Sequence, residues 1–106
     1  MRVDVSFKYL ERSEFIDNVL DKNIQKIERR IKMFRRDDPI HVSIHMEKNP
    51  NREQYFCRTQ VYLPSRVVMS NAKAPNSSQV INKSFSALSK QLDKVKYRME
   101  RHLRKK

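Results

Sequence analysis

The chain has 106 residues, of which 24 are Lys or Arg and 12 are Asp or Glu, giving a formal net charge of +12. This length fits a single domain, residues 1–106, and 38% hydrophobic residues suffice for a modest core. A charge of this size destabilises a compact chain by self-repulsion, so we expect a polyanionic partner. Nucleic acid is the first candidate, because neutralising its phosphates releases condensed counterions, and an anionic membrane surface is the second.

Cysteine content and the N-terminal residues narrow the cellular setting. The single cysteine, Cys57, excludes an internal disulfide and offers too few thiols for a structural zinc site. Charges at Arg2, Asp4 and Lys8 argue against a signal peptide, and no apolar run approaches the length of a membrane span. We therefore expect a cytoplasmic protein with no membrane partner.

The first third of the chain predicts a strand followed by a helix. Residues 2–10 alternate between polar and apolar side chains, which is the period of a half-buried strand. The apolar side, expected to face the core, consists of Val3, Val5, Phe7 and Tyr9. Ser13 can then cap a helix over residues 13–35. The apolar residues at helical spacing in this helix are Ile16, Leu20, Ile24, Ile27, Ile31 and Phe34.

The middle of the chain predicts three further strands joined by short turns. Residues 37–39 break the first helix, and residues 40–47, 55–63 and 66–73 have the patterns of strands. In the second of these three strands, the expected inward side chains are Tyr55, Cys57, Thr59, Val61 and Leu63. The expected outward side chains are Phe56, Arg58, Gln60 and Tyr62.

A second helix is predicted to begin at Asn76 and to run almost to the C-terminus. Asn76 with Gln79 forms a start that resembles a capping box, and residues 102–106 are expected to be a basic tail. The apolar residues that follow at spacings of four and three are Ile81, Phe85, Leu88, Leu92, Val95 and Met99.

The order of these elements predicts an α+β fold, β-α-β-β-β-α. The first strand and the second are joined through a helix, which favours a parallel pair with a right-handed crossover. The later strands are joined by hairpin-length turns, which favours antiparallel pairs. We expect one four-stranded sheet with two helices packed on one face, so that the outer surface of both helices remains free.

Basic residues gather on the predicted outer surface of the helices. On a wheel of about 100° per residue, those of the second helix lie opposite its apolar face. They are Lys83, Lys90, Lys94, Arg98 and Arg101. The first helix repeats this arrangement more weakly with Lys22, Lys26, Arg29 and Arg30. Two basic ridges side by side would form a groove for a phosphate backbone, so all these residues are predicted to bind RNA.

A solvated surface is the simpler interpretation of such a stripe, because Lys and Arg ordinarily lie outside. However, a neutral surface would mix charges of both signs at helical spacing, whereas here like charges stack and repel one another. The stripe therefore favours nucleic acid as the partner.

Other reactive side chains give weaker indications. His45 follows His41 by four positions, which in a strand separates the two by about 13 Å, too far for one metal ion. Cys57 has no visible base and is expected in the core, while Phe56 and Tyr62 could stack on RNA bases or be ordinary exposed aromatics. The chain has no glycine for a phosphate-cradling loop, and no nucleophile–base motif stands out. We expect no enzyme activity, no cofactor, no metal and no small-molecule substrate.

Several segments match the pattern of a known family. They are the first strand followed by Glu11 and Ser13, the segment Lys26, Ile27, Glu28, the pair Glu47 and Lys48, then Ile81 and the run Leu88, Ser89, Lys90, Gln91, Leu92. With these segments the chain resembles the ribosome hibernation promoting factor and ribosome-associated inhibitor family, in its short form, over essentially its whole length.

The resemblance implies the same βαβββα fold, similar in layout to double-stranded RNA-binding domains. It also implies binding to the small ribosomal subunit and its ribosomal RNA. There the family occupies the channel of messenger and transfer RNA near the decoding centre and silences idle ribosomes, as in stress or stationary phase. Lys26, Lys90 and Lys94 match family positions of like charge and would contact ribosomal RNA. The sequence at 76–78 departs from the family, which usually opens the second helix with an acidic and an aromatic residue.

The resemblance also bears on assembly and mechanism. Long-form members carry a further C-terminal dimerisation domain, and without it the chain is expected to be a monomer when free and not to bridge two ribosomes. The expected mechanism is steric, with a folded plug held on RNA phosphates that excludes messenger and transfer RNA. A free-standing double-stranded RNA-binding module and a regulator that binds DNA or an acidic protein remain the alternatives.

Overall fold

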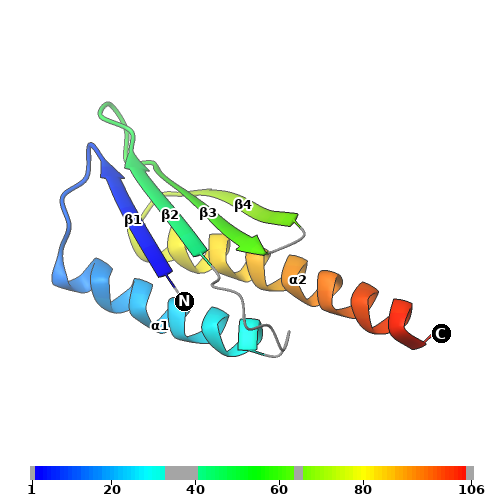
Figure 1. Ribbon diagram of the computed structural model, residues 1–106. Coiled ribbons are helices and arrows are strands. Elements are labelled where there is room, and N and C mark those ends of the chain that lie inside the picture. The colour runs from blue at the N-terminus through cyan, green and yellow to red at the C-terminus, as the bar shows by residue number, and fades with distance from the viewer. Residues whose placement is uncertain (1, 33–40, 64–65, 105–106) are drawn as a thin grey trace.

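The computed structural model describes residues 2–32, 41–63 and 66–104, and the side chains of residues 2–31, 41–63 and 66–98. Its elements, in chain order, are β1 (Arg2–Lys8), α1 (Glu14–Lys32), β2 (His41–Lys48), β3 (Tyr55–Leu63), β4 (Arg66–Ala74) and α2 (Ser77–Arg104) (Figure 1). The predicted order β-α-β-β-β-α is confirmed. Phe34, which was expected to continue the apolar pattern of the first helix, and Ile40, the first residue of the strand predicted over residues 40–47, lie outside the described residues.

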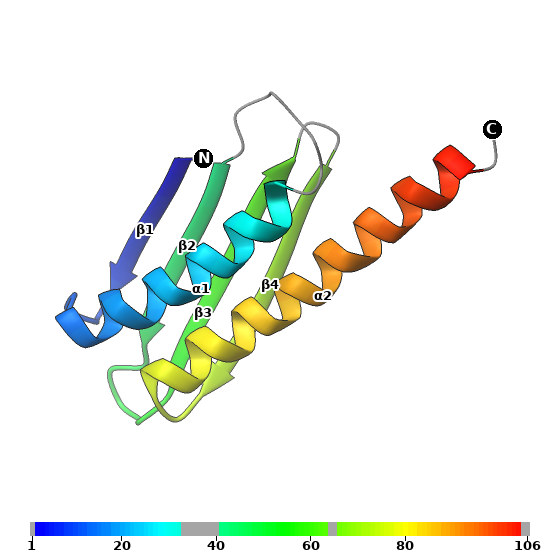
Figure 2. The same ribbon diagram turned by 90° about the horizontal axis from the view of Figure 1, so that it is seen from below.

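The four strands form one mixed sheet in the order β1-β2-β3-β4. Strands β1 and β2 pair in parallel, whereas β2 with β3 and β3 with β4 pair antiparallel. Both helices lie on the same face of this sheet, as predicted (Figures 1 and 2). The outer surface of the helices and the opposite face of the sheet are therefore two separate surfaces.

The core lies between the helices and the inner face of the sheet. Its largest fully buried side chains include Leu20, Ile27, Ile44, Met46, Phe85, Ile81, Leu88 and Leu92. In β3 the predicted alternation is confirmed, because Cys57, Thr59 and Val61 are buried while Arg58 and Tyr62 are exposed. The alternation of apolar and polar residues along β3 thus determines which of its side chains face the core.

Tyr9 departs from the predicted alternation. It follows the last residue of β1 with a φ of 58°, and the residue is 66% exposed. Val3, Val5 and Phe7 do pack against the core. A left-handed backbone is uncommon and costly for a residue with a Cβ, and it interrupts the strand period. The prediction that Tyr9 faces the core was therefore wrong.

Both helices begin at the capping residues that the sequence indicated. The Ser13 hydroxyl accepts a hydrogen bond from the Ile16 backbone N–H at 3.1 Å. The side-chain oxygen of Asn76 accepts one from the Gln79 backbone N–H at 2.9 Å. Each cap satisfies one backbone donor that the first helical turn would otherwise leave unpaired.

Two groups of polar side chains fix the position of α2. Beneath the helix, the buried hydroxyls of Thr59 and Ser70 lie 2.6 Å apart, and the Ser70 hydroxyl donates to the Ser84 carbonyl at 2.7 Å. Between the helices, the Asn23 side-chain amide donates to Asn82 at 3.0 Å. Buried polar groups are costly unless they are paired, so these contacts favour one register of α2 on the sheet.

Helix α2 is longer than the sheet that it covers. At a rise of 1.5 Å per residue its 28 residues span about 42 Å, whereas the nine residues of β3 or β4 span about 30 Å. Among the side chains described, the last buried position of α2 is Val95. The C-terminal part of the helix therefore projects past the sheet (Figure 2).

We predict that Leu88→Ala lowers the free energy of unfolding by about 2 to 5 kcal/mol, because a fully buried side chain is replaced by a cavity. Ser86→Ala is the matched control, since it also introduces alanine into α2 but at an exposed position. Its effect should stay within about 0.5 kcal/mol. Urea unfolding followed by circular dichroism measures both, and equal stability of the two variants would contradict the described core.

Candidate nucleic-acid interface

The basic residues of α2 lie on its outer side. Lys83, Lys90, Lys94 and Arg98 are all exposed. Since successive residues of an α-helix are rotated by about 100° around its axis, these four lie on the side of α2 opposite Ile81, which is completely buried. We call these four residues the α2 basic stripe. The side chain of Arg101, which was predicted to continue it, lies outside the described side chains.

Three of the four predicted basic residues of α1 lie beside α2. Lys22, Lys26 and Arg29 are exposed, and Arg30 is half-buried. Together with Ser89 of α2, the last three of these residues line a hollow of about 320 Å³ between the helices. The structure thus brings together the predicted α1 residues, apart from Lys22, around one concave site.

This hollow differs from the predicted groove in its second wall. Its α2 side is formed by Ser89, and Lys90 lies one residue or about 100° further around the helix. The groove between the helices is therefore basic on its α1 side, while the α2 basic stripe faces outward beyond it. A phosphate backbone that contacts both groups has to pass over the ridge of α2.

An ion pair joins the two helices at the edge of this hollow. The Arg30 guanidinium donates to the Asp93 carboxylate at 2.5 Å, and the two side chains are 41% and 58% exposed. Exposed ion pairs contribute at most about 1 kcal/mol to stability. The pair nevertheless offsets part of the charge of Arg30, which leaves Lys26 and Arg29 as the stronger anion-binding candidates of α1.

Tyr97 was missed by the sequence reasoning. It is 63% exposed on α2, and it lines a second surface hollow with Asp93, Lys94 and Arg98. The sequence alone could have indicated this exposed ring. On the helical wheel Tyr97 falls about 160° from the apolar face, where an aromatic side chain makes no contact with the core. An exposed ring among cations is suited to stacking on a base beside a phosphate.

The opposite face of the sheet carries charges of both signs. His41 contacts the Asp4 carboxylate at 2.5 Å and stacks on the Tyr62 ring, with the ring centroids 5.0 Å apart. His45 contacts the Glu47 carboxylate at 2.8 Å. Each histidine thus has its own partner and points outward, as predicted.

Cys57 is a core residue, as expected. It is fully buried, and this burial raises the pKa of its thiol to about 11. Because the thiolate is the reactive form, the side chain is unreactive near neutral pH. In the part of the chain that is described, no helix has the length and apolar character needed to cross a membrane.

The fold and this surface define a class of small α+β proteins in which two helices cover one face of a four-stranded mixed sheet and present basic side chains outward. The chain belongs to the family described as sigma 54 modulation protein / S30EA ribosomal protein, whose pattern it matches over residues 3–104. The predicted relationship to ribosome hibernation factors is thereby confirmed.

Solved structures with the same fold include two that are similar to this chain. The N-terminal domain of Protein Y from Thermus thermophilus has a TM-score of 0.72 and 16% sequence identity, covering 90% of this chain and 99% of that one. A ribosomal subunit interface protein from Coxiella burnetii has the same TM-score and identity, covering 92% and 99%. No curated protein matches the chain by sequence.

Proposed function

We propose that this protein is a hibernation factor that binds ribosomal RNA of the small subunit near the decoding centre and blocks messenger and transfer RNA there. It acts as a monomer in the cytoplasm and needs no cofactor. The observation that carries the proposal is the concentration of exposed cations on the helical surface of a chain that belongs to a ribosomal protein family. The name of the Coxiella burnetii relative, a ribosomal subunit interface protein, supports a location between the ribosomal subunits.

Electrostatics supply the affinity in this proposal. The α2 basic stripe and the α1 residues Lys22, Lys26, Arg29 and Arg30 place cations on one side of the molecule, and we infer that Arg101 extends the stripe. Contacts between Lys or Arg and phosphates release counterions from the RNA and favour binding without reading its sequence. The projecting end of α2 lengthens this surface beyond the sheet, so that it can follow an RNA backbone.

The mechanism is occlusion and involves no covalent chemistry. A folded body of 54 × 21 × 19 Å placed in the channel of messenger and transfer RNA excludes both by its volume. The alternative, a free-standing double-stranded RNA-binding module, would use the same basic surface on RNA outside the ribosome. The two functions can be distinguished by offering the protein ribosomes and free duplex RNA together: a hibernation factor binds the ribosomes, and a double-stranded RNA-binding module binds the duplex.

We predict that Lys90→Glu combined with Lys94→Glu lowers ribosome affinity by orders of magnitude, because two proposed phosphate contacts become repulsive. Binding of the unaltered protein should weaken steeply with salt, with a slope of about 0.7 to 0.9 per phosphate contact for about five to eight contacts. Pelleting with small subunits at several salt concentrations measures both quantities.

The matched control for this charge reversal is Arg2→Glu combined with Arg66→Glu. It changes the net charge equally, at exposed positions on β1 and β4 instead of the helices. It should weaken pelleting far less than the α2 double variant. Similar losses in the two proteins would mean that overall charge, not the α2 basic stripe, drives binding.

We predict that the added protein inhibits cell-free translation, and that excess messenger RNA and initiator transfer RNA together partly relieve the inhibition. Relief is expected because ligands of the same channel compete for it. The Lys90→Glu, Lys94→Glu protein is the control and should not inhibit at the same concentration. Inhibition that stays constant at every concentration of both RNAs would rule out occlusion.

A further inference from the structure

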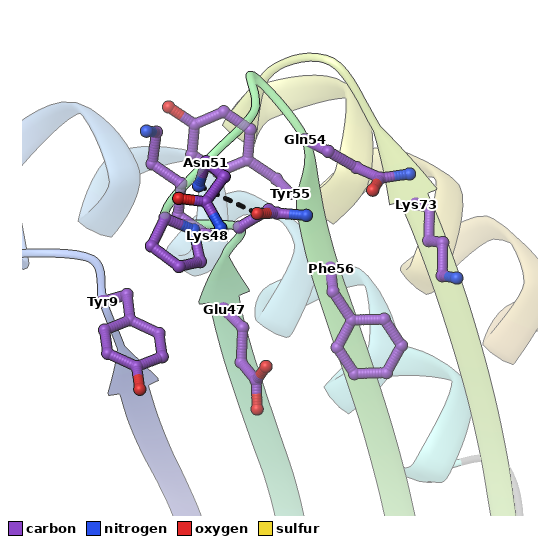
Figure 3. A pocket seen from close by; sticks show the side chains of 10 residues that line it. Tyr9, Glu47, Lys48, Asn51, Gln54, Tyr55, Phe56 and Lys73 are labelled. Atoms are coloured by element: carbon purple, nitrogen blue, oxygen red, sulfur yellow. Dashed lines mark hydrogen bonds between the residues drawn. The ribbon is translucent and has the colours of Figure 1, made fainter.

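A pocket of about 340 Å³ lies at the end of the sheet where β1 and β2 stop, and part of its lining belongs to the outer face of the sheet (Figure 3). Glu47, Phe56 and Lys73 of its lining lie on the side of the sheet opposite the helices, and the proposed ribosome-binding surface does not include the pocket. The side chains that line it include Tyr9, Glu47, Lys48, Asn51, Phe56 and Lys73. This size is at the lower end of the range for sites that bind small organic groups.

Strand register and the turn at Tyr9 explain how these side chains meet. Lys8, Glu47, Phe56 and Lys73 are direct neighbours across the four strands, so their side chains share the outer face. The left-handed backbone of Tyr9 brings its ring to the same place. Figure 3 shows the Glu47 carboxylate between the rings of Tyr9 and Phe56.

Two of the three aromatic rings that line the pocket, those of Tyr9 and Phe56, have a cation beside them. The Lys8 ammonium lies 5.4 Å from the centre of the Tyr9 ring, and the Arg58 guanidinium lies 5.6 Å from the centre of the Phe56 ring. Sites for unpaired nucleotides combine the same two elements, since a base stacks on an aromatic ring while a cation holds its phosphate. The pocket is therefore suited to a nucleotide that is not in a duplex.

Glu47 determines which base fits this arrangement. A hydrogen bond from His45, and then the positive charges of Lys8 and Arg58, lower the pKa of Glu47 below its usual value, so the group is ionised at neutral pH. An ionised carboxylate only accepts hydrogen bonds and has acceptor capacity beyond the one bond to His45. It is thus ready to accept a pair of parallel donors.

Guanine is the RNA base whose Watson–Crick edge offers two adjacent N–H donors, at N1 and N2. Adenine, cytosine and uracil each place an acceptor next to their donor on that edge, and this acceptor would repel the carboxylate. An ionised carboxylate between aromatic rings would therefore favour guanine over the other three bases.

The loop that closes one side of the pocket is held in place before any ligand binds. The Asn49 backbone N–H donates to the Gln54 carbonyl at 2.8 Å, and the Asn51 backbone N–H donates to the Asn49 side-chain oxygen at 2.9 Å. These bonds order a turn that contains no glycine, with Pro50 and Asn51 against the pocket. A preformed wall reduces the entropy lost on binding.

We propose that this pocket binds an unpaired guanine nucleotide of RNA, with Glu47 accepting from N1–H and N2–H, the ring of Tyr9 or Phe56 stacking on the base, and Lys73 contacting the phosphate. The site goes beyond the proposed function, because it reads a base on the face opposite the helices and does not depend on ribosome binding. It would add base selectivity to a protein whose helical surface contacts phosphates.

Amide chemical shifts of the isotope-labelled whole chain test the proposal. The probes are the pentaribonucleotides UUGUU, UUAUU, UUCUU and UUUUU, together with guanosine 5′-monophosphate. UUGUU should shift the amides of Tyr9 and of residues 47–49 and 51–56, and should bind about tenfold more tightly than the other pentamers. Equal affinity for all four, or shifts confined to α1 and α2, would overturn the proposal. If guanosine 5′-monophosphate bound as tightly as UUGUU, the ligand would be a free nucleotide and not a nucleotide of RNA, which would contradict the proposal.

Glu47→Gln should abolish the preference for guanine, because the amide brings a donor against one of the two base donors. Glu53→Gln is the matched control, since this neighbouring carboxylate is exposed and does not line the pocket. A guanine preference that survives Glu47→Gln contradicts the assignment. The Lys90→Glu, Lys94→Glu protein should lose ribosome binding but keep its preference for guanine. The ribosome-binding proposal and the guanine-binding proposal can therefore fail independently of each other.

Discussion

The apolar face of α2, buried against the sheet through Phe85, Leu88 and Leu92, is the contact on which the other features depend. The hydroxyl contacts of Thr59, Ser70 and Ser84 select one register of this face, because a shifted helix would leave buried polar atoms unpaired. Once the inner face is fixed, the helical period directs the α2 basic stripe outward. The charge repulsion within the stripe is tolerated because the core beneath it offsets the cost.

The same layout separates two surfaces with different chemistry. The helical surface presents flexible cations, which suit the uniform charge of an RNA backbone. The outer face of the sheet instead pairs carboxylates with histidines and places aromatic rings beside cations, as at Glu47 and Phe56. If the protein lies among RNA strands as proposed, the helical surface would supply affinity and the outer face of the sheet would supply selectivity.

Periodicity was sufficient to predict the elements, the inward residues of β3 and the caps Ser13 and Asn76, because these depend on neighbours in the sequence. Features made by distant residues could not be predicted in this way. The pair of Arg30 with Asp93 joins positions 63 residues apart, and only the packing of the helices places Ser89 in the wall of the groove. The outward turn of Tyr9 depends on one left-handed backbone angle, which a strand pattern does not reveal. The outward position of Tyr97 does follow from the helical period, but its neutral ring adds nothing to the charge pattern from which the interface was predicted.

The direct test of the account is a cryo-electron microscopy structure of the protein bound to the small ribosomal subunit. In this complex the outer surface of α1 and α2 should face RNA, with phosphates in contact with Lys90 and Lys94 and with the body of the protein in the channel of messenger and transfer RNA. A complex in which that helical surface faces solvent, or in which the protein lies outside the channel, would contradict it.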